Sequence, residues 1–542
     1  MDRPLAIYAT PRRPDANASQ RIFGLNVFMQ EWIRAMAEYR SLPDQLHFFV
    51  APHELEATEQ VIMSWPPHWR SEVLAFSIDE LPQQLRRVNY LAVHYPGGPR
   101  LGEIATLIHG LTGAPTPVTA NHHSLSYGEM LGLLQSELLS DVQPYDAIVA
   151  PSPASMRAHQ TLLRELEDWV SRRHGVAIRS AHQWYLIPHG VSTESFAPGD
   201  RRVARQIAGL PQEGICLIVS GRISAMDKAD LLPVLRIIAE LGPSAPDLVV
   251  VGDDARHEST SVTGAAATLG IGHKVHVFGS VNPQMLRILY HSADVALFPF
   301  DSIQESFGLV ASEAMASGLP CIASDWDGLR AIVKDGETGR LIPTAFCLPD
   351  EDQDALWVLP EMHQLLHLMQ AQTCAVDYEF MRTAIRSTVD DAPLWRRMGT
   401  AALDHVQNSL AWRVVIPQYE RMWAELQDQA GAMPRQDRRS ASALAIRKAF
   451  AHYGTTELRG SVVVSSRRAE SFGGTWDRWL SRIPFVSRCV PSTAAHRVFE
   501  WSEQRRTVNV ASMTVAERMA VQWLRKQGFI TVQSLEGVPS DR

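Results

Sequence analysis

Apolar residues at the start of the chain first form a short run and then recur at helical spacing. Residues 4–10 (PLAIYAT) end in turn-forming residues, whereas Phe28, Trp32 and Ile33 lie on one face of a helix predicted within residues 21–40. A strand, a loop and a helix in this order form the repeating unit of a parallel sheet covered by helices. The pattern therefore predicts an α/β fold.

The same unit recurs in two series along the chain. The first series continues with LHFFVAP, VNYLAVHYP, PVTANHH and YDAIVAPSPASMRAHQTLL. The second consists of GICLIVSGR, DLVVVGDD, KVHVFGS, ADVALFPF and LPCIASDWD. Each series supplies enough strands for a sheet, so we expect two tandem doubly wound domains that face each other across a cleft.

Segments rich in proline, glycine and polar residues mark the boundaries. Residues 184–200 (WYLIPHGVSTESFAPGD) are predicted to link the two sheets, and the polar, basic residues 430–443 form a second linker. After residue 343 an acidic loop interrupts the alternation of strands and helices, and long helices follow. We expect four regions. Two sheet domains cover residues 1–190 and 191–395, closing helices cover 396–430, and a small, mainly helical appendage covers 431–542.

Composition and charge narrow the class of protein. Of 542 residues, 45% are hydrophobic and the net charge is -8. There is neither an apolar run of ~18 residues nor a signal-peptide pattern, so we expect a cytoplasmic protein. The five cysteines lack any C-x-x-C spacing, which argues against disulfides and a cysteine zinc site. Residues 431–542 hold 18 Lys and Arg against 9 Asp and Glu, so the chain is an acidic body with a basic tail.

Charged residues follow one strand of the second series. Arg222 comes directly after the run CLIVSG, and Lys228 follows six residues later. Ligands of doubly wound sheets bind at the carboxyl ends of the strands, where this arginine and lysine would neutralise a diphosphate. The alternative is that both side chains are solvated on a surface loop.

A second candidate is the stretch ESFGLVASEAMASGLP, which changes from a polar loop into a helix of small residues. Glu305 precedes the helix and Glu313 lies within it, roughly 8–12 Å away at ~1.5 Å per helical residue. That separation suits one extended ligand contacted at two points, and the alternative is exposed surface charge. The amides at the helix start would attract anionic oxygens. They belong to Ser306, Phe307, Gly308 and Leu309.

Signals for a metal site are weak. Asp325 and Asp327 form an Asp-x-Asp sequence, but they follow a predicted strand in an ordinary βα loop. His363 and His367 lack the glutamate of an H-E-x-x-H motif, so we expect them on a helix surface or at the edge of the core. Neither a metal site nor a Walker A sequence is predicted.

Five segments in order resemble those of the family-4 retaining glycosyltransferases of GT-B fold, and the resemblance extends over residues 4–427. They are IPHGVSTESFAPG, SGRISAMDKADLL, ESFGLVASEAMASGLPCIAS, LRAIVKDGETGRLI and WRRMGTAALDHV. The resemblance implies an N-terminal acceptor-side domain and a C-terminal nucleotide-sugar domain. It also implies transfer of a hexose from a nucleoside-diphosphate sugar to a hydroxyl acceptor, with retention of configuration and without a cofactor or metal.

The resemblance assigns a role to each candidate. Glu313 would accept hydrogen bonds from the ribose, and Arg222 with Lys228 would hold the leaving diphosphate. Glu305 would lie beside the donor sugar, with the amides after it contacting sugar hydroxyls. The complete set favours a transferase over two alternatives, which are a catalytically silent GT-B scaffold and a phosphorylase or epimerase of the same fold.

Two residues of the N-terminal half are implicated in the same way. The stretch NHHSLSYGEM is similar to the His-Ser-Leu stretch of the sucrose-phosphate synthase branch, which places His123 at the donor sugar. Gly24 would let the first-domain loop approach the diphosphate, although many relatives carry two glycines where this chain has one. Glu305 and His123 are therefore the catalytic candidates.

The basic region 431–542 lies outside the family core. Its patterns predict helices and a short strand at FITV, with arginines interleaved with Trp476, Trp479 and Phe485 between them. Three roles stay open, which are a structural or self-associating appendage, a contact with the inner face of the membrane, and binding of nucleic acid or another polyanion. Nucleic acid is the least supported, because the basic residues are dispersed.

Overall fold

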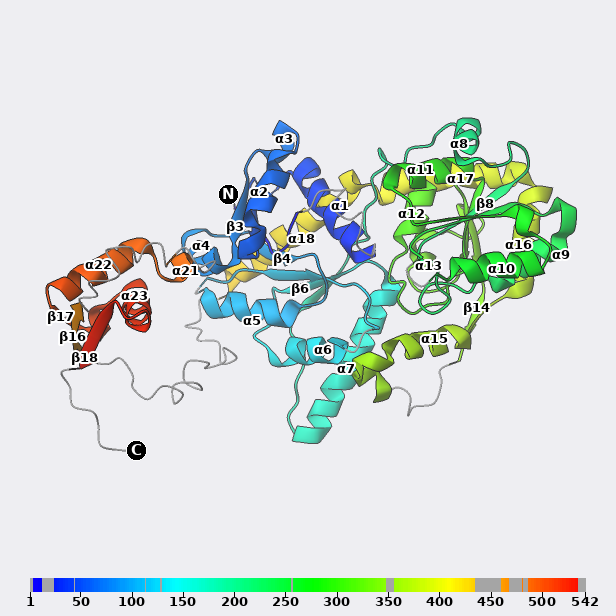
Figure 1. Cartoon of the computed structure of the whole chain (residues 1–542). Coiled ribbons are helices and arrows are strands. Elements are labelled where there is room, and N and C mark those ends of the chain that lie inside the picture. Colours follow the sequence, from blue (N-terminus) through cyan, green and yellow to red (C-terminus); the bar gives the residue numbers. More distant parts are fainter. Residues whose placement is uncertain are drawn as a thin grey trace. The chain divides into compact units, whose positions relative to one another are not determined.

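The structure of the protein is a computed structural model. It describes residues 3–11, 24–42, 44–112, 114–126, 129–254, 257–347, 355–433, 460–466, 480 and 486–534. The chain divides into two compact units, residues 1–443 and 444–542, which are described separately. Figure 1 shows their helices and strands. Within the described residues, no helix combines the length and the apolar character needed to cross a bilayer.

The first half of the larger unit is built on a parallel sheet with the strand order β3-β2-β1-β4-β5-β6-β7 (Figure 1). The strands are β1 (Leu5–Ile7), β2 (Leu46–Val50), β3 (Val73–Ser77), β4 (Ala92–Tyr95), β5 (Val118–Asn121), β6 (Ala147–Ala150) and β7 (Gln183–Leu186). β1, β2 and β6 are buried along their whole length, which explains why they read as nearly continuous apolar runs.

Helices connect and cover these strands. They are α1 (Gly24–Tyr39), α2 (Leu55–Met63), α3 (Pro67–Arg70), α4 (Leu81–Arg87), α5 (Leu101–Leu111), α6 (Glu129–Leu139) and α7 (Pro153–His174). Local sequence sets the limits of α7. Ser152 caps its start by accepting a hydrogen bond from the amide of Ser155, Pro153 occupies the first turn, and Gly175 ends it in the left-handed conformation.

The second half contains a parallel sheet with the order β10-β9-β8-β11-β12-β13. Its strands are β8 (Cys216–Ser220), β9 (Asp247–Val251), β10 (Val275–Gly279), β11 (Val295–Phe298), β12 (Cys321–Ser324) and β13 (Gly339–Ile342). Its helices are α8 (Arg201–Ala208), α9 (Leu232–Leu241), α10 (Ser259–Thr268), α11 (Pro283–Ser292), α12 (Leu309–Ala316) and α13 (Leu329–Ile332). The prediction of two tandem doubly wound sheets is confirmed.

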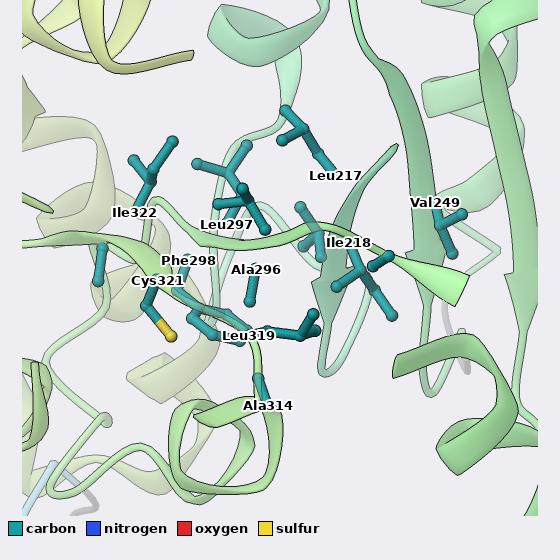
Figure 2. Packing of buried hydrophobic residues seen from close by; sticks show 14 of the residues in the cluster. Leu217, Ile218, Val249, Ala296, Leu297, Phe298, Ala314, Leu319, Cys321 and Ile322 are labelled. Carbon is teal, nitrogen blue, oxygen red and sulfur yellow. The ribbon is translucent and has the colours of Figure 1, made fainter. Parts of the chain in front are cut away.

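The core of this half joins neighbouring strands to the helix that follows β11. Figure 2 shows Ile218 of β8 and Leu297 of β11 among the buried apolar side chains, with Ala314 of α12 nearby. All three residues are fully buried. The small residues of α12 let it pack closely against the sheet, which fixes the position of the loop that precedes it.

An insertion follows β13. β14 (Thr344–Phe346) and β15 (Cys374–Val376) form an antiparallel pair, with the helix α15 (His363–Thr373) between them. Two 3-10 turns, Ala355–Val358 and Pro360–Met362, precede α15. The acidic segment that interrupts the βα rhythm therefore leads into a small substructure of its own.

The closing helices join the two halves. They are α16 (Tyr378–Asp390), α17 (Ala392–Ser409) and α18 (Trp412–Ala432). α17 packs against α12 in the second half, whereas α18 returns to the first half and contacts α1. There Tyr419 donates to Asn121 (3.2 Å) and Trp423 to Thr119 (3.0 Å), both in β5. The chain thus crosses between the halves twice.

The two crossings lie side by side. The amide of Val191 donates to the carbonyl of Leu410 at 2.9 Å, and Val191 forms a parallel bridge with Ala411. The linker between the sheets is shorter than predicted, because Trp184 and Tyr185 belong to β7 and pair with β6. Aromatic residues fit this edge strand, which the proline and glycine content of the segment obscured.

The smaller unit contains an antiparallel sheet in the order β17-β16-β18. Its elements are β16 (Ser461–Ser466), α21 (Val486–Cys489), α22 (Ser492–Glu503), β17 (Thr507–Asn509), α23 (Val515–Lys526) and β18 (Ile530–Ser534). Helices and the strand at FITV were predicted, whereas β16 and β17 were not. The helix predicted at residues 440–453 lies outside the described residues, and so do Trp476, Trp479 and Phe485. Part of the basic charge is neutralised internally, since Arg497 pairs with Glu517 at 2.9 Å.

Candidate active site

The candidate site lies where β8 and β11 end in the second sheet. These two strands are neighbours although β9 and β10 separate them in sequence, so the strand order reverses between them. Ligands of doubly wound sheets bind at such a switch point, beside the carboxyl ends of the strands. The loop after β8 carries Arg222 and Lys228, and the loop after β11 carries Glu305. The amide of Asp301 reaches the carbonyl of Lys228 (3.4 Å), so the two loops meet.

Lys228 and Glu305 form an ion pair at this meeting point. Their side chains are 14% and 13% exposed, and the Lys228 ammonium lies 3.9 Å from the centroid of the Phe300 ring. The structure therefore brings together the cation predicted to hold a diphosphate and the carboxylate predicted to contact a sugar. A ligand that contacts both side chains must place an anionic group beside Lys228 and an adjacent uncharged group beside Glu305.

Arg222 is held by both loops. Its Nη2 donates to the carbonyl of Asp227 (3.0 Å) and to Oε1 of Gln304 (3.1 Å), and its side chain is 23% exposed. Gln304 directly precedes Glu305 in the chain. The orientation of the guanidinium thus depends on a residue that sequence reasoning did not single out.

The loop after β11 turns sharply into α12. Gly308 precedes the helix with a φ of 103°, and a Cβ at this position would lie 2.8 Å from a methyl carbon of Leu329. Among the described residues, no side chain caps this helix start. The prediction of an unsatisfied amide is wrong for Ser306, whose amide donates to the carbonyl of Gln304 at 3.0 Å. Phe307 is buried, and α12 begins at Leu309.

Glu313 lies within α12 and is 9% exposed. Its carboxylate accepts a hydrogen bond from the hydroxyl of Tyr290 (3.1 Å), which in turn bonds with Ser220 at the end of β8 (2.8 Å). Burial raises the pKa of Glu313 to about 7. Sequence reasoning missed Tyr290 and Ser220. Only their position at the end of a strand and on the adjoining helix could have indicated them.

The first half contributes His123. Its Nε2 lies 2.9 Å from the carbonyl of Pro96, and the rings of Phe28 and His189 pack against it. A carbonyl only accepts, so Nε2 carries the proton and Nδ1 is the free acceptor of a neutral ring. Burial lowers the pKa of His123 to about 4, so the ring is uncharged at neutral pH. Gly24 is the first residue of α1, and the loop before it lies outside the described residues.

The two halves touch at the site. Ser152 donates a hydrogen bond to the carbonyl of Ser306 (2.8 Å). The ring of His189, in the linker, lies between Phe28 (3.9 Å between centroids) and Phe307 (5.0 Å). His189 is buried, and sequence reasoning did not single it out as a site residue. It joins α1 to the loop that carries Glu305.

Two further aspartates are placed unusually. Asp301, after β11, is buried, and this burial raises its pKa to about 7. Asp327 has a φ of 40°, and burial together with the nearby Glu305 raises its pKa well above the usual range. Asp325 forms an ion pair with Arg330 (3.1 Å), so the two aspartates do not act together. The described residues contain no group of three or more His, Cys, Asp or Glu suited to a metal.

A cavity of about 310 Å³ lies beside the loop after β8. Arg222 and Lys228 contribute to its lining, together with apolar side chains of α9 and α10 such as Leu235 and Val262. Neither Glu305 nor Glu313 is among the residues that line it. The cavity therefore reaches the two cations of the candidate site but neither of its glutamates.

Part of the chain is similar in sequence to known proteins. Residues 200–352 match the family model for glycosyl transferases group 1. The chain is 38% identical over 162 residues to D-inositol 3-phosphate glycosyltransferase 2 of Catenulispora acidiphila, covering 28% of this chain and 37% of that protein. It is 30% identical over 249 residues to D-inositol 3-phosphate glycosyltransferase of Corynebacterium aurimucosum, covering 44% and 51%. The chain thus matches about a third to a half of the length of these relatives.

Solved structures define the fold class. Sucrose-phosphate synthase of Thermosynechococcus elongatus superposes with a TM-score of 0.51 at 19% identity, covering 79% of this chain and all of that one. Anabaena HepE in complex with UDP gives 0.51 at 14%, covering 78% of this chain and all of that one. At these identities the likeness shows the fold alone. The two sheets of the larger unit form a GT-B fold, as predicted.

Proposed function

We propose that the protein is a glycosyltransferase that transfers a sugar, with retention of configuration, from a nucleoside-diphosphate sugar to a hydroxyl acceptor. The contact between Lys228 and Glu305 carries this proposal. It places a cation that would bind the diphosphate directly beside a carboxylate that would contact the sugar. In a nucleoside-diphosphate sugar, the diphosphate and the sugar are neighbours in the same way. Arg222 and Glu313 extend the site on either side, and the match to group 1 glycosyl transferases includes all four residues.

The proposed reaction assigns a task to each of these residues. The acceptor hydroxyl attacks the anomeric carbon from the face that the diphosphate leaves, through an oxocarbenium-like transition state. Lys228 and Arg222 stabilise the charge that develops on the leaving diphosphate, and we propose that they do so without a divalent metal. Glu305 lies next to the positive anomeric centre, and Nδ1 of His123 accepts a hydrogen bond from a sugar hydroxyl.

A thermal-shift panel tests the proposal. We expect one of UDP-glucose, GDP-mannose, ADP-glucose and TDP-glucose to raise the melting temperature, because a ligand at 100 Kd adds about 2.7 kcal/mol to the free energy of unfolding. UDP is the nucleotide bound in the HepE structure, so UDP-glucose is the first choice. The shift should persist in EDTA and be followed by slow release of the nucleoside diphosphate. A flat response to all four compounds would contradict the proposal.

Donor affinity should rise with pH because of Glu313. Its pKa is raised to about 7, so the carboxyl group is protonated below this value and cannot accept both ribose hydroxyls. Between pH 6 and 8 the Kd for UDP-glucose should fall by up to about tenfold, as the ionised fraction grows by a similar factor. A diphosphate esterified at both ends does not titrate in this range, so the change reports on the protein.

Two variants assign this pH effect. Glu313→Gln should give weak affinity that no longer changes with pH. Asp301→Asn removes the other carboxyl group whose pKa is about 7, and it should leave the slope in place. Isothermal titration at several pH values measures both. A slope that survives in Glu313→Gln and disappears in Asp301→Asn would refute the assignment to Glu313.

A further inference from the structure

The insertion between β14 and β15 contacts both halves of the larger unit through one side chain. His367 of α15 is 4% exposed, and its Nε2 lies 2.8 Å from the carbonyl oxygen of Ser126 in the first half. Its Nδ1 lies 2.9 Å from Nε2 of Gln304 in the second half. The match to the family model ends at residue 352, so α15 lies beyond it.

The direction of each hydrogen bond follows from the groups involved. The Ser126 carbonyl can only accept, so Nε2 of His367 donates to it and Nδ1 carries a lone pair. Nε2 of Gln304 lies 2.9 Å from Nδ1 and 3.2 Å from Nε2 of the ring, and only Nδ1 can accept its proton. Oε1 of Gln304 is then free to accept from Nη2 of Arg222 at 3.1 Å.

These bonds form a continuous chain from the first half to the predicted diphosphate site. Each of these bonds joins a donor to an acceptor, and the chain requires a neutral His367. Burial lowers the pKa of His367, which agrees with that state. The ring is also held by packing, because its centroid lies 5.2 Å from that of Trp357. Such buried hydrogen-bond chains restrict the orientation of the side chains at their ends.

We propose that His367 is a positioning residue, which orients Arg222 toward the donor diphosphate when the segment that contains Ser126 is in place. The same segment carries His123, the candidate for contact with the donor sugar. The same segment then assembles the sugar site and orients the diphosphate site at the same time. This inference rests on the proposed function and adds a residue of the insertion to it.

Three variants test the role of the ring nitrogens. His367→Phe keeps a planar ring against Trp357 but breaks both bonds, and it should raise KM for UDP-glucose and lower kcat for its hydrolysis, together about tenfold in kcat/KM. His367→Gln retains one donor and one acceptor and should recover activity to within about threefold. His273→Phe, at an exposed histidine of the same half, is the matched control and should behave as the unmodified protein.

A double-mutant cycle shows whether His367 acts through Arg222. His367→Phe should cost about tenfold in the normal background and less than about twofold in an Arg222→Met background, because residues of one network are not additive. Equal losses in both backgrounds, no rescue by His367→Gln, or equivalence of the two phenylalanine variants would each overturn the inference alone. Absence of binding and hydrolysis of all panel donors by the unmodified protein would instead overturn the proposed function, and the inference with it.

Discussion

Replacing Glu305 with alanine is expected to abolish sugar transfer while leaving the affinity for UDP within a few fold. The carboxylate lies beside the anomeric centre in the proposed complex, where it stabilises positive charge that exists only in the transition state. Loss of one such electrostatic group lowers kcat by at least about 10²-fold. UDP affinity should hold, because Lys228 loses a competing partner and Glu313 is untouched.

Initial rates of nucleoside diphosphate release and calorimetric titration with UDP measure the two quantities. Glu337→Ala is the matched control, because Glu337 is an exposed glutamate of the same sheet domain that pairs with Lys334. It should change neither quantity. If Glu305→Ala lost UDP binding and kept its kcat at saturation, the carboxylate would belong to the nucleotide and not to the sugar.

Replacing Lys228 with methionine should have the complementary effect. The variant keeps most of the length of the side chain but removes a positive charge from the leaving-group side, and it leaves Glu305 without its ion-pair partner. We expect kcat/KM for UDP-glucose to fall by about 10²–10³-fold and UDP binding to weaken as well.

Lys274→Met provides the control for charge and shape. Lys274 precedes β10 at the amino edge of the same sheet, where it donates to the carbonyl of Ala245 (2.7 Å). Its replacement should leave UDP binding unchanged. A Lys228→Met protein with normal UDP affinity and normal turnover would show that the diphosphate lies elsewhere.

The sequence predicted the sheets well because buried parallel strands are local signals. Runs such as CLIVS and VALF are buried at every position and almost entirely apolar, and the residues that follow them lie at the edge where ligands bind. This reasoning identified Arg222, Lys228 and Glu305 as candidates, and it placed Glu313 in a helix. β16 was missed because the sequence near its valines contains no strand with which they could be seen to pair.

Partners that lie far apart in the chain could not be predicted. His367 and Ser126 are separated by 241 positions, and Tyr290 and Glu313 by 23, yet each pair is joined by a hydrogen bond. No periodicity encodes such pairs, because they depend on how separate elements pack. The occupied amide of Ser306 is a related case, since a one-residue detail of loop geometry decides which donors are available.

The return of α18 to the first half has a consequence for how the protein is made. Trp32 of α1 is fully buried in the core that Tyr419 and Trp423 of α18 complete. A ribosome adds about 5–20 residues per second, so the ~240 residues between the first crossing and the end of α18 take roughly 10–50 s to synthesise. During that time the nascent first half exposes an apolar face around Trp32, which makes it a substrate for chaperones until its last helix emerges.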